Sequence, residues 1–73
     1  MNTINRFLRL PQVTEYTGLR KTAIEDGVRA GTFPQPIKLT DSKRPPVAWL
    51  EADVLAWQNG RIARSRPEGA TGV

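Results

Sequence analysis

The stretch RLPQVTEYTGLRKTAIEDGVRAG, residues 9–31, decides which fold the chain can adopt. Pro11 suits the first turn of a helix because it has no N–H to leave unpaired, and Gly18 closes the segment, so we expect a first helix over 11–17. A second helix is expected over residues 20–30. Two helices joined by a tight turn that contains glycine are typical of a helix-turn-helix unit.

The second helix separates apolar from polar positions. Ile24 and Val28 lie four residues apart on one face, and Gly31 follows as a left-handed cap. Together with Val13 and Leu19, these side chains are expected to hold the two helices at a fixed angle. The positions left on the outside are Arg20, Lys21, Thr22, Glu25, Asp26 and Arg29.

The flanking segments predict a small β structure. Residues 6–10 alternate polar and apolar, as a short half-buried strand or an extended lead-in would. After two prolines that exclude a helix, 37–39 and 47–49 alternate again around a turn-rich 40–46, which predicts a hairpin.

A third helix is expected over residues 51–64. Glu51 and Asp53 place negative charge at its start, where the helix dipole favours it. Its expected apolar face consists of Val54, Leu55, Trp57 and Ile62. Periodicity directs Trp49 and Trp57 inward, so we assign both to the core rather than to base stacking.

These elements define the predicted fold. It is α+β and mostly α: a small winged helix-turn-helix domain over residues 6–64, with three helices and a two-stranded hairpin wing between the second and third. Residues 1–5 and 67–73 are expected to be flexible termini.

Composition narrows the function. The 73 residues suffice for one domain, and they include no cysteine and no histidine, so we expect no disulfide, no metal, no cofactor and no enzyme activity. A net charge of +4 favours a polyanionic partner. No apolar run approaches the roughly 20 residues that cross a bilayer, and no secretory signal precedes the domain, so we expect a cytoplasmic protein without membrane contact.

Duplex DNA is the partner that the second helix suggests, although a helical hairpin with a solvated charged face would show the same spacing. Arg20 and Lys21 can reach guanine edges or, more safely, phosphates. Thr22 can bond a phosphate, touch a thymine methyl group or satisfy a free backbone N–H. Glu25 and Asp26 can accept from the N4 amino group of cytosine, or pair with Arg29 or Lys21 on the same helix.

Two further groups of cations lie outside that helix. Lys38, Lys43 and Arg44, on or near the hairpin, are expected to track phosphates or lean into the minor groove rather than form only a solvated turn. The second run, Arg61, Arg64 and Arg66, can add phosphate attraction or simply keep the helix end soluble, and both alternatives stay open.

Several blocks of the chain resemble the AlpA family of prophage transcriptional regulators and its excisionase-like winged-helix relatives. The blocks are RLPQV, the TGL turn, GTFPQPIKL over 31–39 and AWLEADVLAW over 48–57. The resemblance implies a MerR-like winged helix-turn-helix that binds duplex DNA and controls prophage or integrated-element genes. The resemblance also implies a possible second role, because some of these relatives assist an integrase.

The resemblance carries the recognition helix onto residues 20–30 and the wing onto the turn with Lys43 and Arg44. Arg20 replaces the usual capping serine, and Gly27 stands mid-helix, where it either permits close packing or leaves the helix soft. One small domain covers a single half-site, so a second copy or an integrase is an expected partner. The competing hypothesis is a protein-interaction module that has lost DNA binding.

Overall fold

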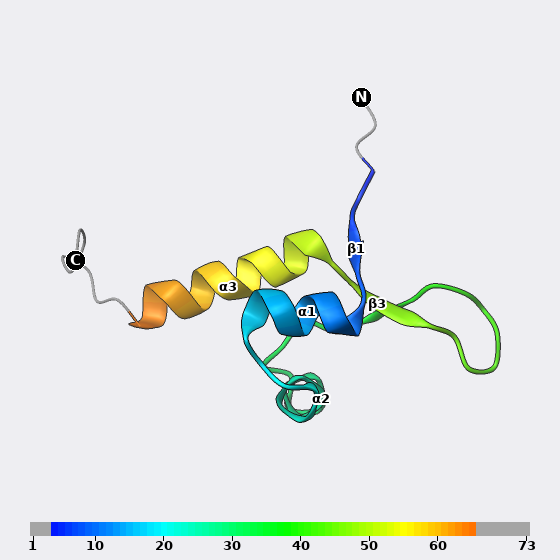
Figure 1. Ribbon diagram of the computed structural model, residues 1–73, viewed down its shortest axis with the longest axis horizontal. Helices are drawn as coiled ribbons and strands as arrows, with labels where there is room; N and C mark the ends of the chain where they lie inside the picture. The colour runs from blue at the N-terminus through cyan, green and yellow to red at the C-terminus, as the bar shows by residue number, and fades with distance from the viewer. Residues whose placement is uncertain (1–3, 66–73) are drawn as a thin grey trace.

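A computed structural model describes residues 4–65, which form three helices and three short strands. Their order is β1 (Phe7–Leu8), α1 (Leu10–Thr17), α2 (Lys21–Ala30), β2 (Ile37–Lys38), β3 (Val47–Leu50) and α3 (Glu51–Ser65). Figure 1 shows α1 alongside α3, α2 seen end-on beneath them, and the β2–β3 hairpin projecting to one side. The predicted fold class and element order are confirmed. Of the predicted flexible ends, 1–5 and 67–73, all but residues 4 and 5 lie outside the described part.

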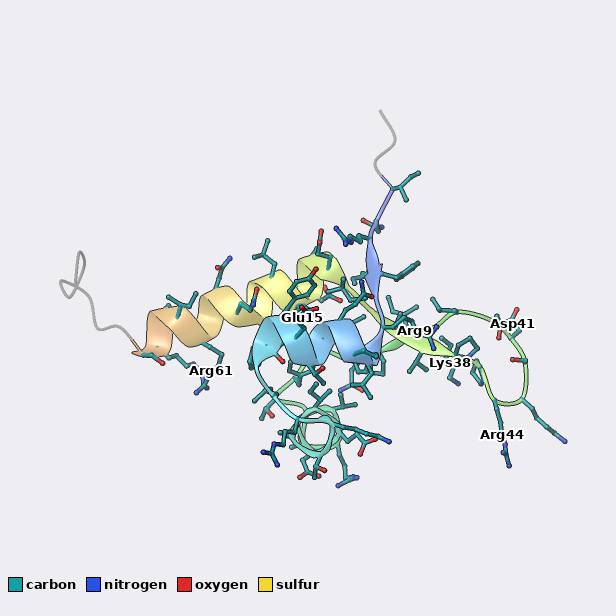
Figure 2. All side chains as sticks on the ribbon, viewed as in Figure 1. Arg9, Glu15, Lys38, Asp41, Arg44 and Arg61 are labelled. Carbon is teal, nitrogen blue, oxygen red and sulfur yellow. The ribbon has the colours of Figure 1, made fainter. Side chains whose placement is uncertain are left out.

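The three strands form one antiparallel sheet of order β1-β3-β2. The predicted hairpin is present and pairs Ile37 with Ala48, and Figure 2 shows Lys38 and Arg44 carried outward on it. The lead-in segment is also a strand, because Leu8 pairs with Trp49 and both side chains are buried. The two-stranded wing therefore has a third strand at its base.

The turn between α1 and α2 depends on a glycine and a threonine. Gly18 has φ +76°, a left-handed conformation that side chains disfavour, and its N–H donates to the Thr14 carbonyl at 2.9 Å. The Thr17 hydroxyl donates to the Val13 carbonyl at 2.7 Å and accepts from the Leu19 N–H at 3.1 Å. These bonds set the direction in which α2 leaves α1.

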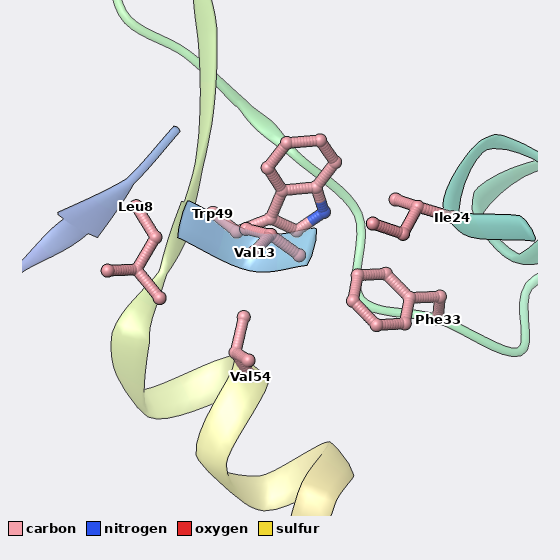
Figure 3. Close-up of a cluster of buried hydrophobic side chains, with 6 residues drawn as sticks. All are labelled: Leu8, Val13, Ile24, Phe33, Trp49 and Val54. Atoms are coloured by element: carbon pink, nitrogen blue, oxygen red, sulfur yellow. The ribbon is translucent and has the colours of Figure 1, made fainter. Parts of the chain in front are cut away.

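The core is one cluster to which all three helices and the sheet contribute, as Figure 3 shows. Its buried members are Leu8, Val13, Ile24, Phe33, Trp49 and Val54. The prediction that both tryptophans belong to the core is confirmed, with Trp57 partly buried against the cluster. Phe33, absent from the predicted core, meets Trp57 and Trp49 edge to face at 5.0 Å and 6.4 Å between ring centroids.

The predicted apolar face of α3 is partly wrong. Val54 is buried and Trp57 packs against the core, but Leu55 and Ile62 are 53% and 52% exposed. Leu55 and Ile62 lie seven residues apart and share one side of the helix, beside the buried Val54 rather than over the core. No helix among the described residues is long and apolar enough to span a bilayer, and residues 4–65 hold no cluster of metal-ligating side chains.

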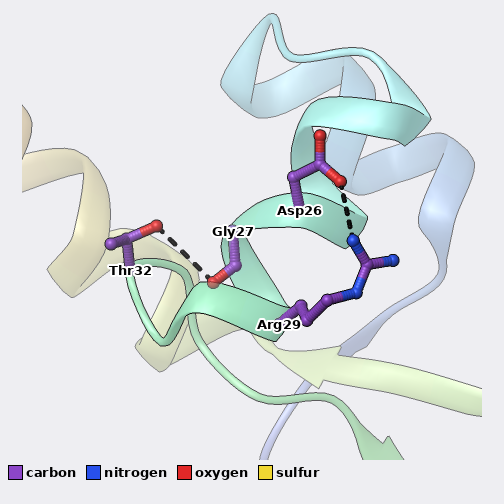
Figure 4. Close-up of polar contacts among 4 residues, drawn as sticks. All are labelled: Asp26, Gly27, Arg29 and Thr32. Carbon is purple, nitrogen blue, oxygen red and sulfur yellow. Dashed lines mark hydrogen bonds and ion pairs between the residues drawn. The ribbon is translucent and has the colours of Figure 1, made fainter.

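Gly27 permits close packing, the first of the two alternatives expected for it. A Cβ at this position would lie 2.8 Å from the Cβ of Phe33. The Gly27 carbonyl accepts from the Thr32 N–H at 2.8 Å and the Phe33 N–H at 3.1 Å, and Figure 4 shows Thr32 turned back over it. The chain leaving α2 therefore folds directly onto the helix.

Candidate nucleic-acid interface

The first turn of α2 is exposed, uncapped and positively charged. Arg20 occupies the N-cap position in extended conformation, and its side chain makes no capping hydrogen bond. The Thr22 hydroxyl takes part in no hydrogen bond among the described residues, so the backbone-capping role considered for it is not seen. Free N–H groups at a helix start, here beside Arg20 and Lys21, form a site suited to an anion such as phosphate.

The middle of α2 combines both signs of charge. Asp26 and Arg29 form an ion pair of 3.1 Å on the surface, shown in Figure 4, which confirms one of the pairings expected for the acidic residues. Glu25 is exposed and belongs to no ion pair within residues 4–65. Asp26 therefore offsets the positive charge of Arg29, whereas the Glu25 carboxylate faces solvent.

A cleft of about 340 Å³ separates α2 from the base of the wing. Its lining residues are Leu10, Glu25, Val28, Arg29, Pro36, Val47 and Trp49. Lys38 is the cross-strand partner of Val47, and paired residues of a sheet present their side chains on the same face. Lys38 therefore belongs to the same side as Glu25 and Arg29, an arrangement that the sequence did not reveal.

The wing tip presents Arg44 on the side of α2. The turn is closed where the Leu39 N–H donates to the Pro46 carbonyl at 2.9 Å, and Lys43 and Arg44 are exposed within it. In Figure 2 the Arg44 side chain extends toward the side of the molecule on which α2 lies, whereas Asp41 points the other way. Asp41, the acidic residue of the turn, therefore points away from the side toward which Arg44 extends.

The candidate residues fall into three exposed groups. They are the helix start with Arg20, Lys21 and Thr22, the cleft with Glu25 and Arg29 together with Lys38 beside Val47, and the wing tip with Lys43 and Arg44. A hollow beside the other end of α2 is formed by Gly31 and Thr32 together with Arg61 and Arg64 of α3. Sequence reasoning left these arginines undecided, because the direction of α3 relative to α2 has no local signal.

An exposed second helix, set by a glycine turn against a first helix and accompanied by a basic hairpin, defines a winged helix-turn-helix protein. The chain belongs to the AlpA family: residues 6–62 match the family described as "Prophage CP4-57 regulatory protein (AlpA)". The family resemblance expected from the sequence blocks is confirmed.

One relative is a protein of Enterobacteria phage P4 named "Uncharacterized protein ORF88", which is 43% identical over 61 residues. That match covers 84% of this chain and 66% of the phage protein. No solved structure matches the chain.

Proposed function

We propose that this protein is a sequence-specific duplex-DNA-binding regulator of prophage or integrated-element genes. The observation that best supports DNA binding is the uncapped start of α2, where Arg20, Lys21 and Thr22 are all exposed. Membership of a family described as regulatory supports the gene-control role. The role requires no catalysis and locates the protein in the bacterial cytoplasm, on the nucleoid.

In the proposed complex α2 enters the major groove and the wing, residues 40–46, follows the adjacent backbone. Arg20 and Lys21 hold phosphates at the start of the helix, and Thr22 contacts a phosphate or a thymine methyl group. Glu25 accepts a hydrogen bond from a cytosine amino group. The remaining contacts, from the cleft and the wing tip to the sugar-phosphate backbone, are assigned to Arg29, Lys38, Lys43 and Arg44.

The test is the affinity for a pool of fluorescent random-sequence duplexes, measured by anisotropy at several salt concentrations. The double change Arg20→Glu and Lys21→Glu should nearly abolish binding and flatten its salt dependence, because phosphate contacts release counterions. Arg6→Gln is the control, since Arg6 pairs with Glu51 at 3.7 Å where the chain enters β1, away from α2 (Figure 1). Unchanged affinity in the double variant would contradict the proposal. Enrichment of one sequence from the pool would support specificity.

A second candidate, a protein-interaction module, is favoured by an apolar surface on the α1–α3 side. Leu55 and Tyr16 are about half exposed, at 53% and 47%, and both line a groove of about 320 Å³. The two roles are compatible if the groove receives the second protein that a single half-site needs for tight binding, either another copy of this chain or an integrase. The interaction module alone predicts that reversing Arg20 and Lys21 leaves function intact.

Stoichiometry on DNA separates these partners. Sedimentation of the purified protein with its selected duplex should show two or more copies if the chain associates with itself, and a single copy if an integrase supplies the second contact. A reporter gene placed behind the selected site, and an excision assay with the integrase added, would distinguish transcriptional control from assistance to recombination.

A further inference from the structure

The last turns of α3 present two exposed arginines. Arg61 and Arg64 lie three residues apart, so they share one side of the helix, and both are exposed. Neither takes part in an ion pair or side-chain hydrogen bond among residues 4–65. Their charges are therefore available to a ligand.

Core packing determines where these arginines lie. Trp57, one turn before Arg61, packs edge to face on Phe33 at 5.0 Å, and Phe33 belongs to the segment that folds back onto α2. This contact brings the second half of α3 next to the end of α2. The two arginines are thus held beside α2 by the same cluster that holds the core together.

A hollow of about 410 Å³ lies at this junction. Its walls are Gly31 and Thr32 from the end of α2, and Trp57, Gly60, Arg61 and Arg64 from α3. Both glycines leave space, since a Cβ at either position would meet nothing within 4 Å. The hollow therefore offers two guanidinium groups beside an unobstructed surface.

The arginines flank α2 on the side away from the wing. In Figure 2, Arg61 extends below α3 on one side of the end-on α2, and Arg44 extends below the hairpin on the other. A helix in the major groove has a phosphate strand along each side of it. The hairpin carries cations on the wing side of α2, and α3 carries them on the opposite side.

We propose that Arg61 and Arg64 bind backbone phosphates of duplex DNA on the side of α2 opposite the wing, so that the domain grips both strands flanking the groove. This inference rests on the proposed DNA-binding function. The competing role for the two charges is purely internal, a favourable interaction with the carbonyl end of α2. Only the first role changes how DNA affinity responds to salt.

The test is the salt dependence of duplex binding by the double variant Arg61→Gln and Arg64→Gln. Each lost phosphate contact lowers the slope of log affinity against log salt by about 0.9, so the double variant should lose about 2 from its magnitude. Affinity should fall by a similar factor on every sequence, leaving the ratio between the selected site and random DNA unchanged. Arg6→Gln, the control that removes one arginine charge away from α2, should retain the slope of the unmodified protein.

The outcomes separate this inference from the proposed function. If the unmodified protein binds DNA and the double variant keeps its slope, or loses no more than Arg6→Gln does, the inference is overturned and the function stands. If the double variant unfolds more easily but keeps its slope, the two charges have the internal role, and the inference is again overturned. If the unmodified protein binds no duplex, both proposals fall.

Discussion

Gly27 lies where α2 and the segment that follows it approach most closely. Its missing side chain leaves space for Phe33, and its carbonyl receives two backbone N–H groups from that segment. Glycine inside a helix costs about 1 kcal/mol relative to alanine, so packing must outweigh helix propensity for this residue to favour stability. Gly27 therefore weakens α2 locally but allows Phe33 to pack closely against the helix.

Gly27→Ala is expected to lower the free energy of unfolding by about 1 kcal/mol, since overpacking costs roughly 1–3 kcal/mol and exceeds the helical gain. Phe33 cannot yield easily, because the close atom is its Cβ and the ring is held between two tryptophans. Gly60→Ala in α3 is the matched control: its Cβ meets nothing within 4 Å, so the free energy of unfolding should rise by about 1 kcal/mol. Urea unfolding of both variants measures this, and equal stabilisation by the two would disprove the packing role.

The Asp26 carboxylate limits the positive charge of α2 by pairing with Arg29. Asp26→Asn should therefore raise affinity for duplex DNA several-fold and steepen its salt dependence. The free energy of unfolding should change by less than about 0.5 kcal/mol, because exposed pairs contribute little. Glu15→Gln removes the same charge from α1, outside the candidate interface, and should leave affinity nearly unchanged. Weaker binding by Asp26→Asn would instead identify Asp26 as a base contact.

Among the elements, the segment between α2 and β2 depends most on tertiary contacts. The Trp49 indole N–H donates to the Pro34 carbonyl at 2.8 Å, and the Gln35 amide donates to the Val28 carbonyl at 2.8 Å. Two prolines keep the segment extended, and these bonds tie it to the sheet and to α2. The angle between α2 and the wing therefore depends on side-chain hydrogen bonds of Trp49 and Gln35, because the segment between α2 and β2 contains no helix or strand.

Trp49→Phe should lower the free energy of unfolding by about 2 kcal/mol. The Pro34 carbonyl loses its hydrogen-bond donor, and the core loses the packing of the larger indole ring. Trp57→Phe serves as the comparison, since Trp57 also packs edge to face on Phe33 but donates no hydrogen bond to another described residue. It should cost about 1 kcal/mol. Far-UV circular dichroism during urea unfolding reports both variants, and equal losses would show that the indole hydrogen bond contributes nothing.

Local signals predicted the individual elements well. Pro11, Gly18 and Gly31 placed the first two helices to within a residue, because each acts through its own backbone. The hairpin followed from alternation and turn residues for the same reason. The side of α3 that meets the core was less predictable, since Leu55 and Ile62 are apolar but exposed, and the choice among apolar residues depends on packing partners distant in sequence.

At the scale of the whole molecule, long-range pairing explains most of what the sequence could not predict. The pairing of Phe7 with Leu50 joins the start of the domain to the strand that leads into α3, and no residue near either marks the other as its partner. The position of Lys38 relative to Glu25 depends in the same way on how the hairpin meets α2. The candidate residues were named from local chemistry, whereas the positions of Glu25, Arg29 and Lys38 relative to one another required the folded chain.

The proposed DNA-binding face extends over three parts of the domain, the start of α2, the cleft and the wing tip, so it should respond to DNA as a unit. The most direct test is an NMR titration of isotope-labelled protein with random-sequence duplexes, first at low and then at moderate salt. We predict chemical-shift changes concentrated on residues 20–29 and 43–44 that fade as salt rises, because phosphate contacts release counterions. If those residues show no change at low salt, α2 and the wing do not bind DNA, and the search turns to a protein partner.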